Sequence, residues 1–240
     1  MTIPSATSAA KRLRRMHDKL FRAYGPQFWW PAKTRFEVIL GAYLTQNTSW
    51  KAVEGSLKNL REAGALTIDG LRSLPLESLK ELIRPSGFYT RKAPALKAFI
   101  AMLDAEFDGS LERLAAAQTA DVRKRLLALP GLGPETADAI LLYALDHPVP
   151  VADEYLRRIT IRHQLVEPPP AKNRKGYEEM VKLTRDAFSR DPDSTRTMLL
   201  NEFHALSVAV GKAHCGKKPD CEHCPLSGDL QHTRRSGKPT

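Results

Sequence analysis

Apolar side chains recur three and four residues apart along most of the chain. This spacing places them on one face of an α-helix. Stretches in which apolar and polar residues alternate, as they do in a half-buried strand, are nearly absent. The pattern therefore predicts an all-α protein. The expected helices cover residues 8–23, 34–45, 49–63, 67–73, 76–84, 91–107, 110–117, 119–128, 134–145, 153–165, 175–189 and 193–212.

Proline and glycine mark the connections between the expected helices. The clearest internal linker is the segment 167–176, which contains three consecutive prolines and three basic residues. Because proline is excluded from a helix interior and charge keeps a backbone solvated, we expect a loop there. We expect the residues after Thr233 to be disordered.

The composition is that of a globular protein. The chain has 240 residues, of which 42% are hydrophobic and 27% are charged, so it is long enough and apolar enough to bury a core. No apolar run reaches the roughly 18 residues that a membrane-spanning helix needs, and no apolar stretch follows the basic residues near the start. We therefore expect a cytoplasmic protein that does not interact with membranes.

The charge balance favours a polyanionic partner. Lys and Arg total 37 against 27 Asp and Glu, which gives a net charge of +10, and the isoelectric point is near 9.6. Such a surplus raises the local concentration of polyanions, although many soluble proteins are also basic. Nucleic acid is therefore the leading candidate for a partner.

A glycine-rich turn is expected between the helices 119–128 and 134–145. It reads Leu129-Pro-Gly131-Leu-Gly133-Pro-Glu-Thr-Ala137. Two glycines in such a turn expose backbone amides, which together with a helix N-terminus can bind phosphate. A dinucleotide-binding loop is a poorer interpretation, because Thr136 stands where its third glycine belongs and the preceding segment is helical. A simple corner between two helices is the other alternative.

The segments that follow carry a resemblance to a known family. The sequences LPGLGPETADAILLYA and VPVADEYLRRI together resemble the helix-hairpin-helix and Gly/Pro…Asp signature of the endonuclease III superfamily of DNA glycosylases. The resemblance implies that Gly131, Gly133 and Thr136 of the hairpin bind the DNA backbone. It also implies that Asp153 is the carboxylate essential for base excision. An Asp before an apolar-periodic run is in addition a common helix N-cap.

One residue departs from the bifunctional members of that superfamily. They carry a lysine nucleophile 18 residues before the aspartate, and Glu135 occupies that position here. A lysine forms a Schiff base with the sugar and leads to strand cleavage, which a glutamate cannot do. The resemblance thus implies a monofunctional glycosylase, in which Asp153 stabilises the positive charge of the transition state and water is the nucleophile. Alternatively, the only role of Glu135 is a favourable interaction of its carboxylate with the positive end of the helix dipole.

All three tryptophans of the chain fall within 22 residues, in Trp29-Trp30-Pro31 and in the run LTQNTSW that ends at Trp50. Tryptophans beside a helical run commonly belong to a core. This pair of motifs, however, resembles closely the type III 3-methyladenine DNA glycosylases. The resemblance implies that Trp29, Trp30, Pro31 and Trp50 line the pocket for the flipped base and that Gln46 lies in the loop inserted into DNA. Segment 86–93 resembles a second turn that faces the backbone.

Three cysteines lie close together near the end of the chain. Cys215, Cys221 and Cys224 resemble the superfamily's [4Fe–4S] loop, but the first spacing is one residue shorter and the fourth position is Leu230. Because an iron–sulfur cluster normally takes four cysteines, three outcomes stay open. They are an iron–sulfur cluster completed by a histidine, a zinc ion, or no metal. Base excision itself requires no metal. The candidate histidines are His214, His223 and His232.

The resemblance also implies a two-lobed, all-α fold with a cleft. One lobe is a six-helix barrel over 37–148 that contains the hairpin, and the other combines 1–36 with 149–240 and contains the cysteines. The expected function is base excision repair in the cytoplasm, near the nucleoid. A monomer would hydrolyse the N-glycosidic bond of alkylated purines such as 3-methyladenine in double-stranded DNA, after flipping the damaged base.

Two alternatives to this function stay open. One is a glycosylase of the same superfamily that acts on oxidised pyrimidines or on mismatched thymine or adenine. The other is a DNA-binding module of the hairpin type without catalytic activity, which the presence of Asp153 at the matching spacing disfavours.

Overall fold

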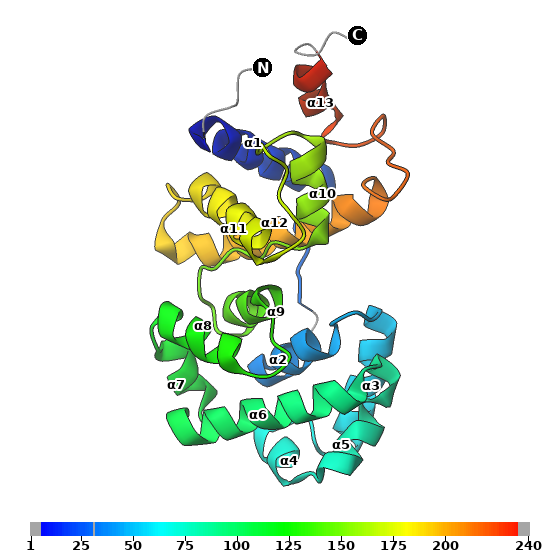
Figure 1. Cartoon of the computed structure of the whole chain (residues 1–240), viewed down its shortest axis with the longest axis vertical. Coiled ribbons are helices and arrows are strands. Elements are labelled where there is room, and N and C mark those ends of the chain that lie inside the picture. Colours follow the sequence, from blue (N-terminus) through cyan, green and yellow to red (C-terminus); the bar gives the residue numbers. More distant parts are fainter. Residues whose placement is uncertain (1–5, 31, 235–240) are drawn as a thin grey trace. The chain divides into compact units, whose positions relative to one another are not determined.

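A computed structural model describes residues 6–30 and 32–234, with side chains given for 8–30 and 32–230. Over these residues the chain forms helices and no strand (Figure 1). The prediction of an all-α protein is therefore confirmed. None of the described helices is both long and apolar enough to cross a bilayer.

Contacts between residues divide the chain into two units. We call residues 30–147 the central unit and the two segments 1–29 and 148–240 the N/C unit. The central unit contains α2 (Arg35–Leu44), α3 (Trp50–Glu62), α4 (Ile68–Ser73), α5 (Leu76–Leu82), η1 (Arg84–Ser86), α6 (Tyr89–Phe107), α7 (Leu111–Ala116), α8 (Thr119–Ala128), α9 (Pro134–Ala139) and η2 (Ile140–Ala144). The N/C unit contains α1 (Ala6–Tyr24), α10 (Glu154–Arg162), α11 (Arg174–Ala187), α12 (Asp193–Ala213) and α13 (Ser227–Arg234). The lobe boundaries and the cleft expected from the sequence stay predictions.

Helix α2 forms the centre of the central unit's core. Every residue from Phe36 to Leu44 is buried, which agrees with its nearly continuous apolar sequence. It contacts α3, α6 and η2, and the Tyr43 ring lies 6.1 Å from the ring of Phe99.

Four helices of this unit begin at a Ser or Thr whose side chain accepts an N–H of the first turn, which stabilises a helix start. These caps are Thr34, Ser49, Thr67 and Ser110.

The N/C unit is organised around α1 and α12. Helix α1 contacts both α11 and α12, and α12 contacts α10. The C-terminal α13 is attached through Asp229, which accepts hydrogen bonds from Arg12 at 2.6 Å and His163 at 2.9 Å. Burial alone would raise the pKa of Asp229, but these hydrogen bonds outweigh it and hold the pKa below its usual range.

The structure differs from the predicted helices at several points. The predicted helix 134–145 is α-helical only to Ala139 and continues as the π-helical turn η2. Helix α6 begins at Tyr89, two residues earlier than predicted. The sequence pattern did not predict α13, whose attachment depends on the distant Arg12 and His163. The residues predicted to be disordered after Thr233 lie outside the described residues, except for Arg234 at the end of α13.

Candidate active site

The glycine turn joins α8 to α9, and its two glycines have different roles. Gly131 has a φ of +76°, a conformation that residues with a side chain rarely adopt. Gly133 has an extended backbone at the N-cap of α9, and an added Cβ there would meet no atom within 4 Å. The backbone conformation therefore favours a glycine at position 131. At Gly133 the missing side chain instead leaves open space.

Gln46 links the end of α2 to this hairpin. Its Nε2 donates hydrogen bonds to the carbonyl of Gly131 at 3.1 Å and to the hydroxyl of Thr136 at 3.0 Å. Three residues predicted to contact DNA are thus connected directly, although Gln46 is 85 residues from Gly131 in the sequence. Glu135, at the position of the superfamily's lysine, is exposed in the first turn of α9.

Sequence reasoning missed Phe88, which lies beside the hairpin. Its side chain is 58% exposed and its φ is +49°, which is strained for a residue with a side chain. Phe88 lines a cavity of about 190 Å³ together with Gln46, Asn47 and Gly131. The signal in the sequence is an apolar residue directly after a glycine in the turn of segment 86–93.

The turn that carries Phe88 is anchored by a buried lysine. Lys92 Nζ donates hydrogen bonds to the carbonyls of Leu44 and Ser86, each at 2.8 Å. Burial lowers the pKa of this ammonium group. Lys92 therefore ties the Phe88 turn to the end of α2, from which Gln46 follows two residues later.

Two of the predicted pocket tryptophans meet in the central unit. The rings of Trp30 and Trp50 lie 5.5 Å apart, edge to face, and the ring of Tyr143 lies 5.5 Å from Trp30. The Trp30 indole packs so closely on Gly41 of α2 that an added Cβ would come within 3.1 Å of it. Both tryptophans keep part of their surface accessible. The predicted pocket residue Pro31 lies outside the described residues.

In the N/C unit, Asp153 is the N-cap of α10. Its Oδ1 accepts the backbone N–H of Leu156 at 2.8 Å, and the residue is only 8% exposed. The second carboxylate oxygen, Oδ2, lies 3.8 Å from Nε2 of His204 on α12. The cap thus holds the carboxylate in one orientation and leaves its other oxygen on the side of the imidazole.

Trp29 lies on the same histidine. Its ring is 5.4 Å from the ring of His204, so an indole, an imidazole and the Asp153 carboxylate follow one another within the N/C unit. The structure therefore assigns Trp29 and Trp30, which are adjacent in the sequence, to different units. His204 was not identified from the sequence, because a histidine in a largely apolar helix reads as an ordinary core residue.

The three cysteines line one cavity of about 10 Å³, together with His214 and Leu230. Arg162 donates a hydrogen bond to Cys215 Sγ at 2.7 Å, and burial raises the pKa of the Cys224 thiol. Among the described side chains, no group of three or more His, Cys, Asp or Glu is arranged to hold a metal ion.

The three cysteines offer one thiolate fewer than a four-iron cluster normally takes. Leu230 occupies the fourth position of the family's loop. His223 is exposed and bonded to Asp220, and the side chain of His232 lies outside the described ones. Metal binding by these cysteines stays a prediction, and no step of the reaction is assigned to it.

Comparison with known proteins identifies the family. The family described as HhH-GPD superfamily base excision DNA repair protein matches residues 40–184. A protein of Methanocaldococcus jannaschii that carries the assignment DNA repair glycosylase is 38% identical over 214 residues, which cover 88% of this chain and 92% of that protein.

Solved structures agree with this. The 3-methyladenine DNA glycosylase of H. pylori, bound to 1,N6-ethenoadenine, matches with 28% identity and a TM-score of 0.69 over 87% of this chain and 97% of its own. Endonuclease III trapped as a covalent intermediate with DNA shares the fold, with 21% identity and a TM-score of 0.72 over 94% of this chain and 98% of its own. The chain therefore belongs to the HhH-GPD superfamily and is a base excision repair DNA glycosylase.

Proposed function

We propose that this glycosylase removes cationic alkylated purines, such as 3-methyladenine, from double-stranded DNA by hydrolysis and does not cleave the strand. The observation that carries the proposal is the placement of a buried carboxylate and an indole on the same histidine in the N/C unit. Asp153 can act on the sugar, and Trp29 offers an aromatic face for a base.

The proposed role of Asp153 follows from the charge that develops in the reaction. As the N-glycosidic bond breaks, positive charge builds on the deoxyribose ring. A carboxylate fixed in a water-poor site stabilises that charge without having to reorganise. The cap to Leu156 supplies the orientation, and the burial of Asp153 supplies the low dielectric.

The nucleophile in this proposal is water. Glu135 occupies the position of the superfamily's lysine, and a carboxylate cannot form an imine with the sugar. Asp153 would orient the water as well as stabilise the sugar cation. The product is then an abasic site in an intact strand.

The preference for a cationic base is supported by the aromatic side chains. Alkylation at a ring nitrogen gives the purine a positive charge, which weakens its bond to the sugar. The charge also adds a cation–π term of about 0.5–2 kcal/mol to stacking on an indole. Trp29, Trp30 and Trp50 provide such faces, and the similar H. pylori enzyme is by name a 3-methyladenine glycosylase.

In this proposal the hairpin and Phe88 bring the damaged base out of the duplex. Backbone amides near Gly133 would bind phosphates and fix the register of the DNA. Phe88 would insert its exposed ring between bases, as apolar wedges do in proteins that unstack DNA. The hydrogen bonds of Gln46 to the hairpin would fix the position of the Phe88 wedge relative to the phosphate-binding amides.

The test is single-turnover excision from a panel of duplexes. The panel contains 3-methyladenine, an oxidised pyrimidine, mismatched thymine and mismatched adenine, each analysed with and without alkali. We expect release of 3-methyladenine, strand breaks only after alkali, and no covalent product on addition of borohydride. Release of another base alone would replace the alkylpurine assignment, and a borohydride adduct would contradict hydrolysis by water. Release of no base at all would leave the non-catalytic DNA-binding module.

A further inference from the structure

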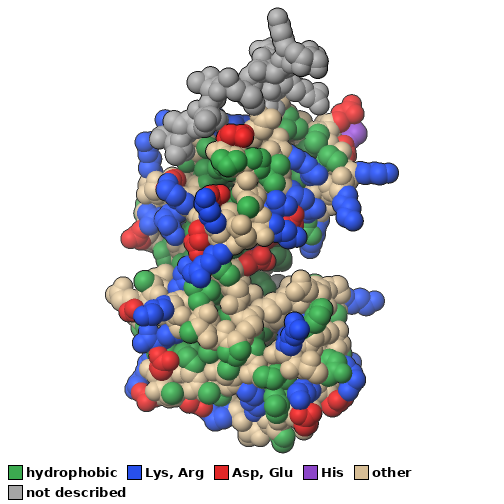
Figure 2. Space-filling view, in the orientation of Figure 1, with side chains coloured by type: hydrophobic (Ala, Val, Ile, Leu, Met, Phe, Trp, Pro, Cys, Tyr) green, Lys and Arg blue, Asp and Glu red, His purple; other side chains and the backbone are tan. Residues whose placement is uncertain are grey.

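The positive charge of the protein is distributed unevenly. The N/C unit contains 22 Lys and Arg against 13 Asp and Glu, whereas the central unit contains 15 against 14. On the face shown in Figure 2, Lys and Arg side chains are spread over the N/C unit among apolar and acidic ones. Nearly all of the net charge therefore belongs to the unit that does not contain the hairpin.

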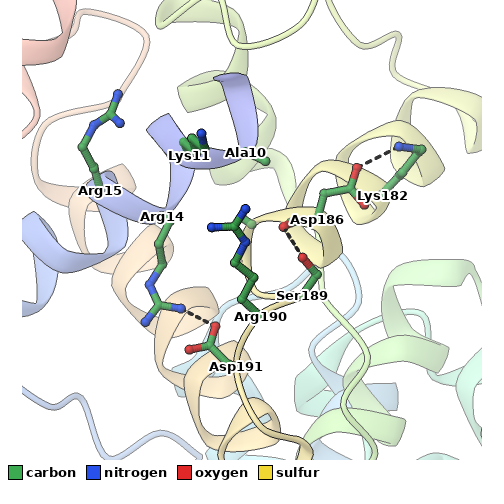
Figure 3. A pocket seen from close by; sticks show the side chains of 10 residues that line it. Ala10, Lys11, Arg14, Arg15, Lys182, Asp186, Ser189, Arg190 and Asp191 are labelled. Carbon is green, nitrogen blue, oxygen red and sulfur yellow. Dashed lines mark hydrogen bonds and ion pairs between the residues drawn. The ribbon is translucent and has the colours of Figure 1, made fainter. Parts of the chain in front are cut away.

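Part of this charge surrounds a groove of about 700 Å³ within the N/C unit. The groove lies between α1 and the end of α11 with the loop that follows it (Figure 3). Five cationic and two acidic side chains line it. They are Lys11, Arg14 and Arg15 of α1, Lys182 and Asp186 of α11, and Arg190 and Asp191 of the loop.

The acidic side chains of the groove are already paired. Lys182 Nζ lies 2.7 Å from Asp186, and Arg14 forms an ion pair with Asp191 (Figure 3). The other three cations, Lys11, Arg15 and Arg190, are exposed and form no ion pair with another described residue. The groove thus keeps a surplus of three cations, two of which are guanidinium groups.

We infer that this groove binds the sugar–phosphate backbone of double-stranded DNA, in addition to the contacts made by the hairpin. Guanidinium forks match phosphate oxygens in pairs, and an ammonium group adds a mobile point charge. The volume exceeds that needed for a single phosphate, so a stretch of backbone is the better match. The inference rests on the DNA glycosylase function but not on the identity of the lesion.

DNA suits the groove better than an acidic protein does. Protein interfaces take most of their binding energy from buried aromatic, Met and Arg anchors in apolar pockets. The apolar side chains of this groove are only Ala10 and Ala187. Attraction there would be mainly electrostatic, which is how proteins bind DNA without regard to sequence. The groove would hold undamaged DNA while lesions are sought.

The test measures binding of an undamaged duplex at a series of salt concentrations. The variant carries Lys11→Gln, Arg15→Gln and Arg190→Gln together. The slope of log K against log salt is negative, and each lost phosphate contact reduces its magnitude by about 0.9, so we expect a slope that is shallower by up to about 2.7. Because the duplex carries no lesion, the result does not depend on base specificity, and either proposal can fail without the other.

A matched control removes the same charge from the central unit. It carries Lys58→Gln, Lys80→Gln and Arg113→Gln, whose cations are already paired with Glu62, Glu77 and Asp108. We expect a much smaller change in slope. Equal slopes for the triple variant and the wild type, or for the triple variant and this control, would overturn the inference.

Two further measurements test the same inference independently. The single variant Arg190→Glu, in the exposed loop, should weaken DNA binding at low salt and lose that effect at high salt, without lowering the melting temperature. Polyglutamate serves as the competing probe. If the triple variant loses binding to polyglutamate but keeps the wild-type slope on DNA, the groove takes an acidic protein and the inference is wrong.

Discussion

The hairpin of the central unit and the Asp153 site of the N/C unit are built in different ways. The hairpin presents backbone groups of residues within a few positions of one another, and Gln46 joins it from a distant position in the sequence. The Asp153 site consists of side chains contributed by Trp29, Asp153 and His204, from three separate segments. Backbone groups suit a ligand that repeats regularly, as phosphates do, whereas precisely placed side chains suit chemistry at one atom.

The two units also differ in net charge. The central unit is almost neutral, so its contacts with DNA would position the strand more than they attract it. The N/C unit carries the positive surplus and also contains Asp153. Most of the salt-dependent affinity for DNA would therefore come from the same unit that performs the chemistry. Substitutions in the two units are therefore expected to change different measurements.

The largest effect is expected for Asp153→Asn. An asparagine caps a helix about as well as an aspartate, so the melting temperature should stay near that of the wild type. The neutral amide cannot stabilise the sugar cation, and single-turnover excision should fall at least about 10²- to 10³-fold. Binding to a duplex with an abasic-site analogue should be retained. Excision at the wild-type rate would reduce Asp153 to a cap and remove the contrast between the two units.

A smaller loss is expected for Trp50→Ala. If the indole stacks on the flipped base, its removal costs about 1–3 kcal/mol, or roughly ten- to a hundredfold in the rate of 3-methyladenine excision. Binding to the abasic-site analogue should change little, because that ligand has no base to stack. Trp50→Phe is the control, since it keeps an aromatic face. A parallel loss of excision, binding and melting temperature would show that Trp50 belongs to the core.

The smallest effects separate the two glycines of the hairpin. Gly133→Ala should lower the free energy of unfolding by less than about 1 kcal/mol, because alanine caps a helix less well than glycine but the backbone is extended and the added methyl group meets no atom within 4 Å. It should weaken binding to undamaged duplex, where the methyl group would meet the phosphate. Gly131→Ala should instead lower the free energy of unfolding by about 1 kcal/mol, because its φ is positive. Unchanged DNA binding by Gly133→Ala would contradict the role of the hairpin amides.

Features whose residues lie close together in the sequence were predicted, whereas contacts between residues far apart in the sequence were not. The hairpin and the cap at Asp153 involve residues at most a few positions apart, and their turn and cap signals were readable directly. The connection of Gln46 to Gly131 was not, because it depends on how α2 and α9 pack. The sequence predicts a turn around Phe88 but not the exposure of its ring, since only the packed structure shows which apolar side chains stay outside.

The sequence alone predicts the all-helical fold, the hairpin, the carboxylate at the start of α10 and the absence of a lysine at position 135. Each of these depends on local periodicity, on turn and capping residues, or on the type of a single residue. Only the tertiary structure decided that His204 lies beside Asp153, that Trp29 and Trp30 belong to different units, and that cations from α1 and the loop after α11 share one groove. These neighbours come from segments far apart in the chain. Burial of apolar faces brings them together, and no short stretch of sequence records it.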